Sequence, residues 1–187
     1  MLELLVPDEM VARVSEIDLQ ALARRGIEGL VLDVDNTLVP WGSIELSPET
    51  ERWALAAKQR FPICLMSNSV RGRRVREVAE RLGVPGLSAW GLRRKPFRGG
   101  VAAAARRLGT APEHTAMIGD QLLTDVLAGN RMGMYTIWVQ RISPHEFIAT
   151  RLNRLIEGYF ARRLERAGLL PAPLPRPGAH TGGECDD

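Results

Sequence analysis

Two carboxylates stand together at the end of an apolar run, in the stretch GLVLDVDNTLVPW at residues 29–41. Asp33 follows the run Leu30 to Leu32 directly, and Asp35 follows two residues later. Like charges this close repel each other, so the protein must supply a cation or a shared proton to hold both. The pair therefore indicates a site that works on charged groups.

More polar residues follow later apolar runs of the chain. Ser67 and Asn68 come after the run ICLM, Asp120 and Asp125 come after TAMI and a glycine, and Lys95 lies between them. In open α/β sheets the carboxyl ends of parallel strands meet at one edge, where ligands bind. We therefore expect these five side chains to gather around the first two carboxylates.

This carboxylate set favours Mg²⁺, because hard oxygen ligands in small number suit an ion that keeps waters and binds phosphate. The predicted metal residues are Asp33, Asp35, Asp120 and Asp125. Asp33 and Asp120 would share the ion, and Asp125 would orient its waters.

The predicted reaction is phosphoryl transfer. Asp33 would attack phosphorus and carry an aspartyl-phosphate, and Asp35 would protonate the leaving oxygen and then deprotonate the attacking water. Ser67, Asn68 and Lys95 would bind the phosphate oxygens, and Lys95 would also neutralise the charge that develops on them.

The elements that must position these residues alternate along the chain. Strands are predicted at residues 29–34, 62–66, 86–90, 115–118 and 135–139, and helices at 47–60, 72–82, 97–108 and 123–132. Ser47 and Pro48 are typical of a helix start, and a glycine follows each of the other three helices. The alternation predicts an α/β domain with a five-stranded parallel sheet and helices on both faces.

The stretches that carry the predicted site residues follow one another too closely along the chain for a folded cap domain to lie between them. One domain is predicted over residues 1–170, with a core at about 27–142, a C-terminal helix at about 144–168, and a disordered tail at 171–187. A capless site is open, so another subunit, a flap near Trp41 or the bulk of the substrate must cover it.

Composition limits the class of protein. A chain of 187 residues with 45% hydrophobic and 25% charged residues suits one globular domain. The two cysteines, Cys64 and Cys185, make neither a disulfide framework nor a metal knuckle. No run approaches the ~20 apolar residues of a membrane span, and the N-terminus lacks the features of a signal peptide. A cytoplasmic protein is expected.

Charge is concentrated in residues 71–107, which hold eleven Arg and Lys against two Glu. This segment is +9 and the rest of the chain is −6, which suits a phosphate ester, a lipid headgroup or nucleic acid. A solvated helix face would explain the same pattern. Nucleic acid is disfavoured, because the segment offers only Trp90 and Phe97 as aromatic partners.

Four motifs resemble those of the haloacid dehalogenase-like (HAD) phosphatase superfamily: DVDNT, the SN pair, RKP and GDQLLTD. The longer stretches PDEMVARVSEIDLQALARRGIEGLVLDVDNTLVPW and GDQLLTDVLAGNRMGMYTIWV are similar to the YqeG-type branch of subfamily IIIA. The resemblance covers roughly residues 2–165 and fills every motif position. It implies a Rossmann-like HAD core and a working active site.

The branch includes phosphatidylglycerophosphate phosphatases of mitochondria and plastids, so the resemblance implies that lipid phosphate as the substrate. A soluble sugar or nucleotide phosphate is the alternative, and a non-catalytic basic adaptor for RNA or ribosomes is a third. Apolar residues and arginines share the predicted C-terminal helix, including Tyr159, Phe160, Arg162 and Arg163. This helix would either lie peripherally on an anionic membrane or dock on the core.

Overall fold

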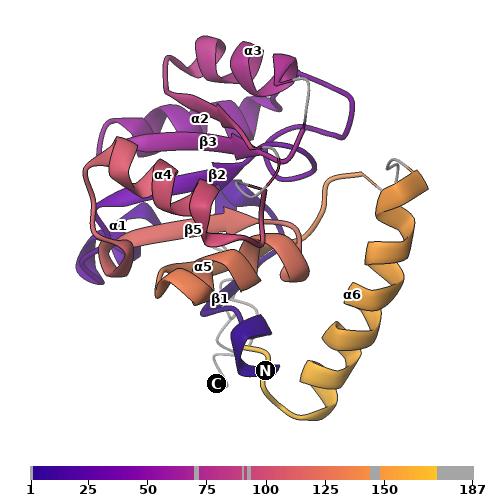
Figure 1. Ribbon diagram of the computed structural model, residues 1–187. Coiled ribbons are helices and arrows are strands. Elements are labelled where there is room, and N and C mark those ends of the chain that lie inside the picture. Colours follow the sequence, from indigo (N-terminus) through magenta and orange to yellow (C-terminus); the bar gives the residue numbers. More distant parts are fainter. Residues whose placement is uncertain (1, 70–71, 90, 92–93, 144–147, 172–187) are drawn as a thin grey trace, which may run out of the picture.

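Six parallel strands form one sheet in the computed structural model of the chain (Figure 1). The structure describes residues 2–69, 72–89, 91, 94–143 and 148–171. The strands are β1 Glu9–Val11, β2 Gly29–Asp33, β3 Ile63–Ser67, β4 Gly86–Ser88, β5 Thr115–Gly119 and β6 Tyr135–Val139, in the order β1-β6-β5-β2-β3-β4. The five predicted strands are all present, and Trp90, predicted in the third, lies outside the described residues.

The prediction of five strands was wrong by one, because the N-terminal segment adds β1 to the edge of the sheet. β1 pairs in parallel with β6, from Glu9 beside Ile137 to Val11 beside Val139. The Asp8 carboxylate fixes this edge, since it accepts hydrogen bonds from the backbone N–H and the hydroxyl of Thr136. Three residues that begin with an acid carry little strand signal of their own, so this strand depends on its partner.

The helices predicted between the strands are present, and α1 is an additional helix that the sequence analysis did not specify. They are α1 Leu19–Arg24, α2 Pro48–Lys58, α3 Arg73–Leu82, α4 Arg98–Leu108, a π-helical turn Leu122–Val126 that continues into α5 Leu127–Met132, and α6 Ile148–Arg166. Short 3₁₀ turns occur at Leu2–Leu5, Val14–Glu16 and Pro112–His114. The Ser47 hydroxyl accepts from the Thr50 N–H at the start of α2. The described connections between strands hold only helices and loops, which agrees with a core without a cap.

Both faces of the sheet are covered, and β2 at its centre is buried along its whole length. Leu30 and Leu32 pack on one side, with Leu22 of α1, Trp53 of α2 and Val75 of α3 among their cluster. Val31 and Cys64 face the other side, toward α4 and α5, which lie in front of the sheet in Figure 1. Cys64 is a free cysteine in this core.

The second half of α6 is packed on the core. Leu164 is fully buried in a cluster with Leu5, Leu122 and Val126, and Phe160 packs against this cluster. The buried Glu157 carboxylate accepts from the Leu123 N–H at the start of the π-helical turn (3.2 Å). No described helix combines the length and apolar character that crossing a membrane requires.

The domain limits stay predictions. Residues 144–147, where the C-terminal helix was predicted to begin, and residues 172–187 of the predicted tail lie outside the described residues.

Candidate active site

The carboxyl ends of β2, β3 and β5 bring the predicted site residues together. Asp33 is the last residue of β2, Ser67 is the last of β3, and Asp120 follows the last residue of β5. These strands are neighbours in the sheet, and their parallel register aligns their ends. The expectation that residues far apart in the sequence share one edge is therefore met by the sheet order.

Three buried carboxylates form the centre of the site. One oxygen each from Asp33, Asp120 and Asp125 lies within 4.8 Å of the others. Gly119 makes this packing possible, because a β-carbon at this position would overlap the Asp125 carboxylate. In the described part of the chain, Asp33 Oδ2 is buried and has no hydrogen-bond partner. Hard oxygen donors at this spacing, one of them unsatisfied, fit a divalent cation such as Mg²⁺.

Lys95 lies among these carboxylates and is only 3% exposed. Its Nζ lies 2.5 Å from Asp33 Oδ1 and 2.6 Å from Asp125 Oδ1. Burial lowers the pKa of Lys95, but Asp125 and Asp33 outweigh it, so the net shift is upward and the ammonium stays charged. Burial raises the pKa of Asp33 well above its ordinary value; Lys95 opposes this, and the neighbouring carboxylates add to it. A further cation at this centre would relieve that repulsion.

Asn68 holds the backbone that carries Lys95. The side-chain Nδ2 of Asn68 donates to the Lys95 carbonyl (3.0 Å), and the Lys95 N–H donates to Asn68 Oδ1 (2.9 Å). This amide was predicted to bind the phosphate, whereas both of its polar groups contact the backbone of Lys95. We therefore propose that Asn68 positions Lys95.

Asp35 faces a different set of partners from Asp33. The Ser67 hydroxyl donates to Asp35 Oδ2 (2.9 Å) and accepts from the Ser69 N–H (3.1 Å). Arg74 Nη2 lies 2.7 Å from Asp35 Oδ1. The Asp35 side chain is 18% exposed, although its Oδ1 is buried, so solvent can reach part of this side chain. Lys95 pairs with Asp33 and Arg74 with Asp35, which explains how two adjacent carboxylates are held at one strand end.

Trp41, where the sequence allowed a flap over the site, lies beside Asp35 together with Arg74, whose role was not predicted. Asn36 adopts a left-handed backbone conformation (φ 63°), and its Oδ1 accepts from the Trp41 N–H at 3.1 Å. The Arg74 guanidinium lies over the Trp41 ring, 5.3 Å from its centre. Arg74 was counted only as one cation of a basic segment, and nothing in its local sequence distinguishes it from its neighbours.

Comparisons with known proteins agree with this geometry. A family model described as HAD-hydrolase-like matches residues 92–141, which include Lys95, Asp120 and Asp125. The chain is 35% identical over 164 residues to a probable phosphatase, YqeG, of Bacillus subtilis, covering 87% of this chain and 93% of that protein.

A second relative is phosphatidylglycerophosphate phosphatase 1 of the Chlamydomonas reinhardtii chloroplast, 30% identical over 178 residues. The match covers 90% of this chain and 65% of that protein. Among solved structures, an uncharacterized protein from Listeria monocytogenes serotype 4b aligns with a TM-score of 0.51 at 16% identity. That alignment covers 67% of this chain and 88% of the other, and it supports the fold alone.

Proposed function

Because the chain belongs to the YqeG type of HAD phosphatases, we propose that it hydrolyses a phosphomonoester with Mg²⁺ through an aspartyl-phosphate on Asp33. The observation that carries this proposal is that the two carboxylates at the end of β2 have different surroundings. Asp33 is buried beside Lys95, with Oδ2 unsatisfied within the described residues, while the Asp35 side chain is partly exposed and contacts Ser67 and Arg74. One carboxylate is placed to attack and the other to transfer protons.

Asp33 and Asp120 are the residues that would hold the metal ion, and Asp125, whose carboxylate lies close to theirs, would orient its waters. Bound there, Mg²⁺ would offset the excess negative charge of the site and neutralise phosphate oxygens. Asp35 was also predicted as a ligand. Its carboxylate contacts Ser67 and Arg74 instead, so we assign this side chain to proton transfer.

In the first half of the reaction, an Asp33 oxygen forms a bond to phosphorus as the bond from phosphorus to the leaving oxygen breaks. Asp35 gives its proton to that oxygen, so the product is an alcohol. In the second half, Asp35 takes a proton from water, which attacks phosphorus and releases inorganic phosphate from Asp33. Lys95 donates hydrogen bonds to the phosphoryl oxygens in both halves. The Ser67 hydroxyl donates to Asp35 in the structure, and it would turn its one proton from Asp35 to bind a phosphoryl oxygen.

The substrate proposed is phosphatidylglycerophosphate, because the chloroplast relative is named as a phosphatase of this lipid. The test is a screen of this lipid, sugar phosphates, nucleotides and an aryl phosphate, each with and without Mg²⁺. We expect hydrolysis that requires the metal and is fastest for the lipid in mixed micelles. Faster turnover of a soluble sugar or nucleotide phosphate would overturn the assignment of this lipid as the substrate. No turnover of any ester would favour a non-catalytic adaptor.

The metal assignment predicts that replacing Asp120 and replacing Asp125 weaken the response to Mg²⁺ to different extents. Asp120→Ala should raise the Mg²⁺ concentration needed for half-maximal activity steeply. Asp125→Ala should raise it by about 10- to 100-fold, the range for residues that orient ligands or their waters. Activity is measured against Mg²⁺ concentration, with Glu113→Ala as the matched control, because Glu113 is an exposed acid that precedes the opposite end of β5. Full activity after metal removal by EDTA would contradict both assignments.

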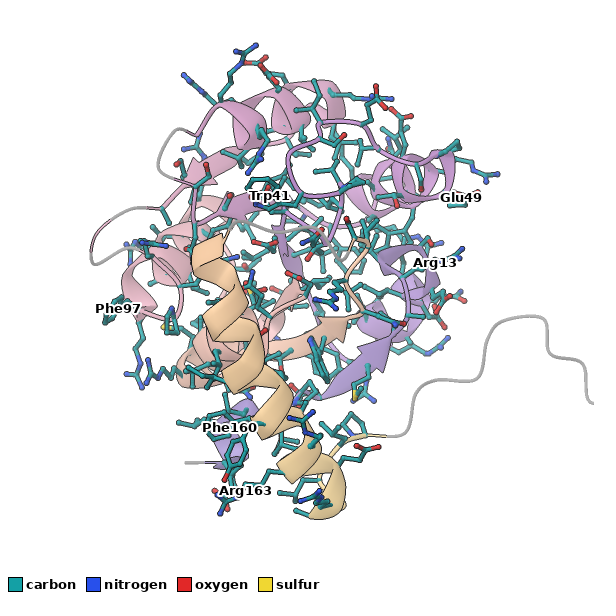
Figure 2. The ribbon with its side chains drawn as sticks, turned by 90° about the vertical axis from the view of Figure 1, so that its right-hand side faces the viewer. Arg13, Trp41, Glu49, Phe97, Phe160 and Arg163 are labelled. Carbon is teal, nitrogen blue, oxygen red and sulfur yellow. The ribbon has the colours of Figure 1, made fainter. Side chains whose placement is uncertain are left out.

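We also propose that α6 contacts an anionic membrane, which would present the lipid to the open site. Figure 2 looks onto the face along which α6 runs, with Phe160 and Arg163 toward one end. The exposed side chains of its described part include Ile156, Tyr159, Arg162, Arg163 and Arg166. Apolar and aromatic residues mixed with arginines suit the interface between headgroups and acyl chains. The buried Glu157 and Leu164 anchor the helix, so docking on the core leaves this other face exposed.

This surface predicts binding to vesicles that contain anionic lipid, weaker at high salt, and no binding to neutral vesicles. Each arginine contributes ~1 kcal/mol near such a surface, so replacing Arg162, Arg163 and Arg166 by glutamine should abolish most of the binding in sedimentation. Replacing the exposed Arg24, Arg52 and Arg60, near or within α1 and α2, makes the same charge change elsewhere. Equal losses in the two triple variants would show that only net charge matters.

A further inference from the structure

A second cation stands beside the site, apart from the residues that would bind the transferring phosphate. Arg74 lies in the first turn of α3, with Nη2 2.7 Å from Asp35 Oδ1 and its guanidinium over Trp41. We propose that Arg74 and Trp41 form a second anion subsite. It would bind an additional phosphate or phosphodiester carried by the alcohol that leaves. This inference rests on the proposed phosphatase function and names the substrate class.

The position of Arg74 follows from the role of Asp35. Asp35 gives its proton to the leaving oxygen, so the leaving alcohol must lie next to this carboxylate. Arg74 contacts the same carboxylate and therefore stands beside the alcohol, whereas Lys95 contacts Asp33 and Asp125. The two cations are thus assigned to the two ends of the substrate.

Exposure separates the two cations in the same way. The Lys95 side chain is 1% exposed, enclosed by the carboxylates that would hold the metal and the transferring phosphoryl group. The Arg74 side chain is 24% exposed, so a group arriving from solvent can reach it. Trp41 is also exposed (39%) and offers an apolar face next to the guanidinium.

The chemistry of the guanidinium suits a second anion. It carries five N–H donors in a flat fork that matches two oxygens of a phosphate. Within the described residues, Asp35 is its acidic partner through Nη2, which leaves further donors for a ligand. The Trp41 ring orients the fork, and the hydrogen bond from the Trp41 N–H to Asn36 holds the loop that carries the ring.

Other arginines of α3 are engaged differently. Arg73 pairs with Glu77 on the same helix, and Arg81 pairs with Glu51 of α2, in both cases at the surface. Arg74 instead pairs with Asp35, so a carboxylate of the site fixes the position of its side chain.

The substrate class is a phosphomonoester of an alcohol that bears another anionic phosphate. Phosphatidylglycerophosphate has this form, because its glycerol carries the monoester at one end and a lipid phosphodiester at the other. A small soluble bisphosphate has the same pair of anions. The two sources share their chemistry and differ in whether a lipid is attached.

The test compares kcat and KM for three soluble substrates with wild-type protein and Arg74→Gln. Glycerol 1-phosphate has one anionic group; glycerol 1,3-bisphosphate and a short-chain phosphatidylglycerophosphate, kept below its micelle concentration, have two. Arg74→Gln should raise KM about 10- to 100-fold for the two-anion substrates, the usual effect of hydrogen bonds to charged groups. KM for glycerol 1-phosphate should change far less, whereas kcat should fall by a similar factor for all three substrates, because Arg74 also pairs with Asp35. Arg74→Lys should recover part of the loss, since it keeps the charge without the fork.

The matched control is Arg73→Gln, which makes the same charge change one residue away, and it should leave all three KM values unchanged. If Arg74→Gln raises KM more for the short-chain lipid than for the bisphosphate, the second anion is a lipid phosphodiester. If it raises KM more for the bisphosphate, the second anion belongs to a soluble bisphosphate. Equal changes in KM for one-anion and two-anion substrates, or equal effects of the two arginine variants on KM, would overturn the subsite while the phosphatase stands. Wild-type protein that hydrolyses none of these esters would overturn the proposed function, and the subsite with it.

Discussion

Asp33→Asn is expected to abolish phosphate release while the protein stays folded. The asparagine amide cannot attack phosphorus and cannot supply a charged oxygen to Mg²⁺. Its carbonyl oxygen can still accept the hydrogen bond that Lys95 donates to Asp33 Oδ1. Lys95 also keeps Asp125 as an ion-pair partner, so its charge is not left alone in the interior. The loss should therefore appear in turnover and not in the fold.

The measurement is phosphate release from an aryl phosphate at saturating Mg²⁺, with circular dichroism and thermal unfolding to establish that the variant is folded. Asp18→Asn is the matched control. Asp18 caps α1 through the N–H groups of Gln20 and Ala21, a role that asparagine also fills, and it is expected to keep full activity. A folded Asp33→Asn protein with wild-type turnover would remove the nucleophile from the mechanism.

Asp35→Asn is expected to slow release of the alcohol by about 10²–10⁴-fold, the usual contribution of general acid–base catalysis. The loss in the first turnover should be large for an alkyl ester, whose alkoxide must be protonated, and small for an aryl ester, whose phenolate leaves unaided. Asparagine can still accept one hydrogen bond, from Ser67 or from Arg74, so the loop should keep its place. Stopped-flow or quenched-flow release of the two alcohols measures this difference.

Equal losses for alkyl and aryl esters in the first turnover would assign Asp35 another task, such as holding Ser67 and Arg74 in place. Ser67→Ala helps to separate the two roles, because it removes the hydrogen bond to Asp35 without removing the proton donor. Its loss should be similar for both esters.

The arrangement of the core and of the site carboxylates could be predicted from the sequence. Each internal strand is a short apolar run, and the end of each run predicts where Asp33, Ser67 and Asp120 lie. These signals are local, and the rule that parallel strands share a carboxyl edge does the rest. β1 was missed because its three residues gain strand character only from pairing with β6.

Side-chain partnerships across the site could not be read from the chain. Asn68 and Lys95 are 27 residues apart, and their mutual hydrogen bonds depend on how two loops meet. Arg74 and Asp35 likewise meet only when α3 is placed beside the loop after β2. The mixture of apolar residues and arginines in the C-terminal helix allowed two interpretations. Contacts of Glu157 and Leu164 establish the docking of its second half.

The most direct test of the account is to look for a phosphoryl group on Asp33 itself. In the Asp35→Asn variant with an aryl phosphate and Mg²⁺, the first half of the reaction should proceed while hydrolysis of the aspartyl-phosphate lacks its base. We expect a burst of phenolate equal to the amount of enzyme. After an acid quench and borohydride reduction, peptide mass spectrometry should find homoserine at position 33. Phenolate release without a burst, or a phosphorylated residue other than Asp33, would contradict the mechanism.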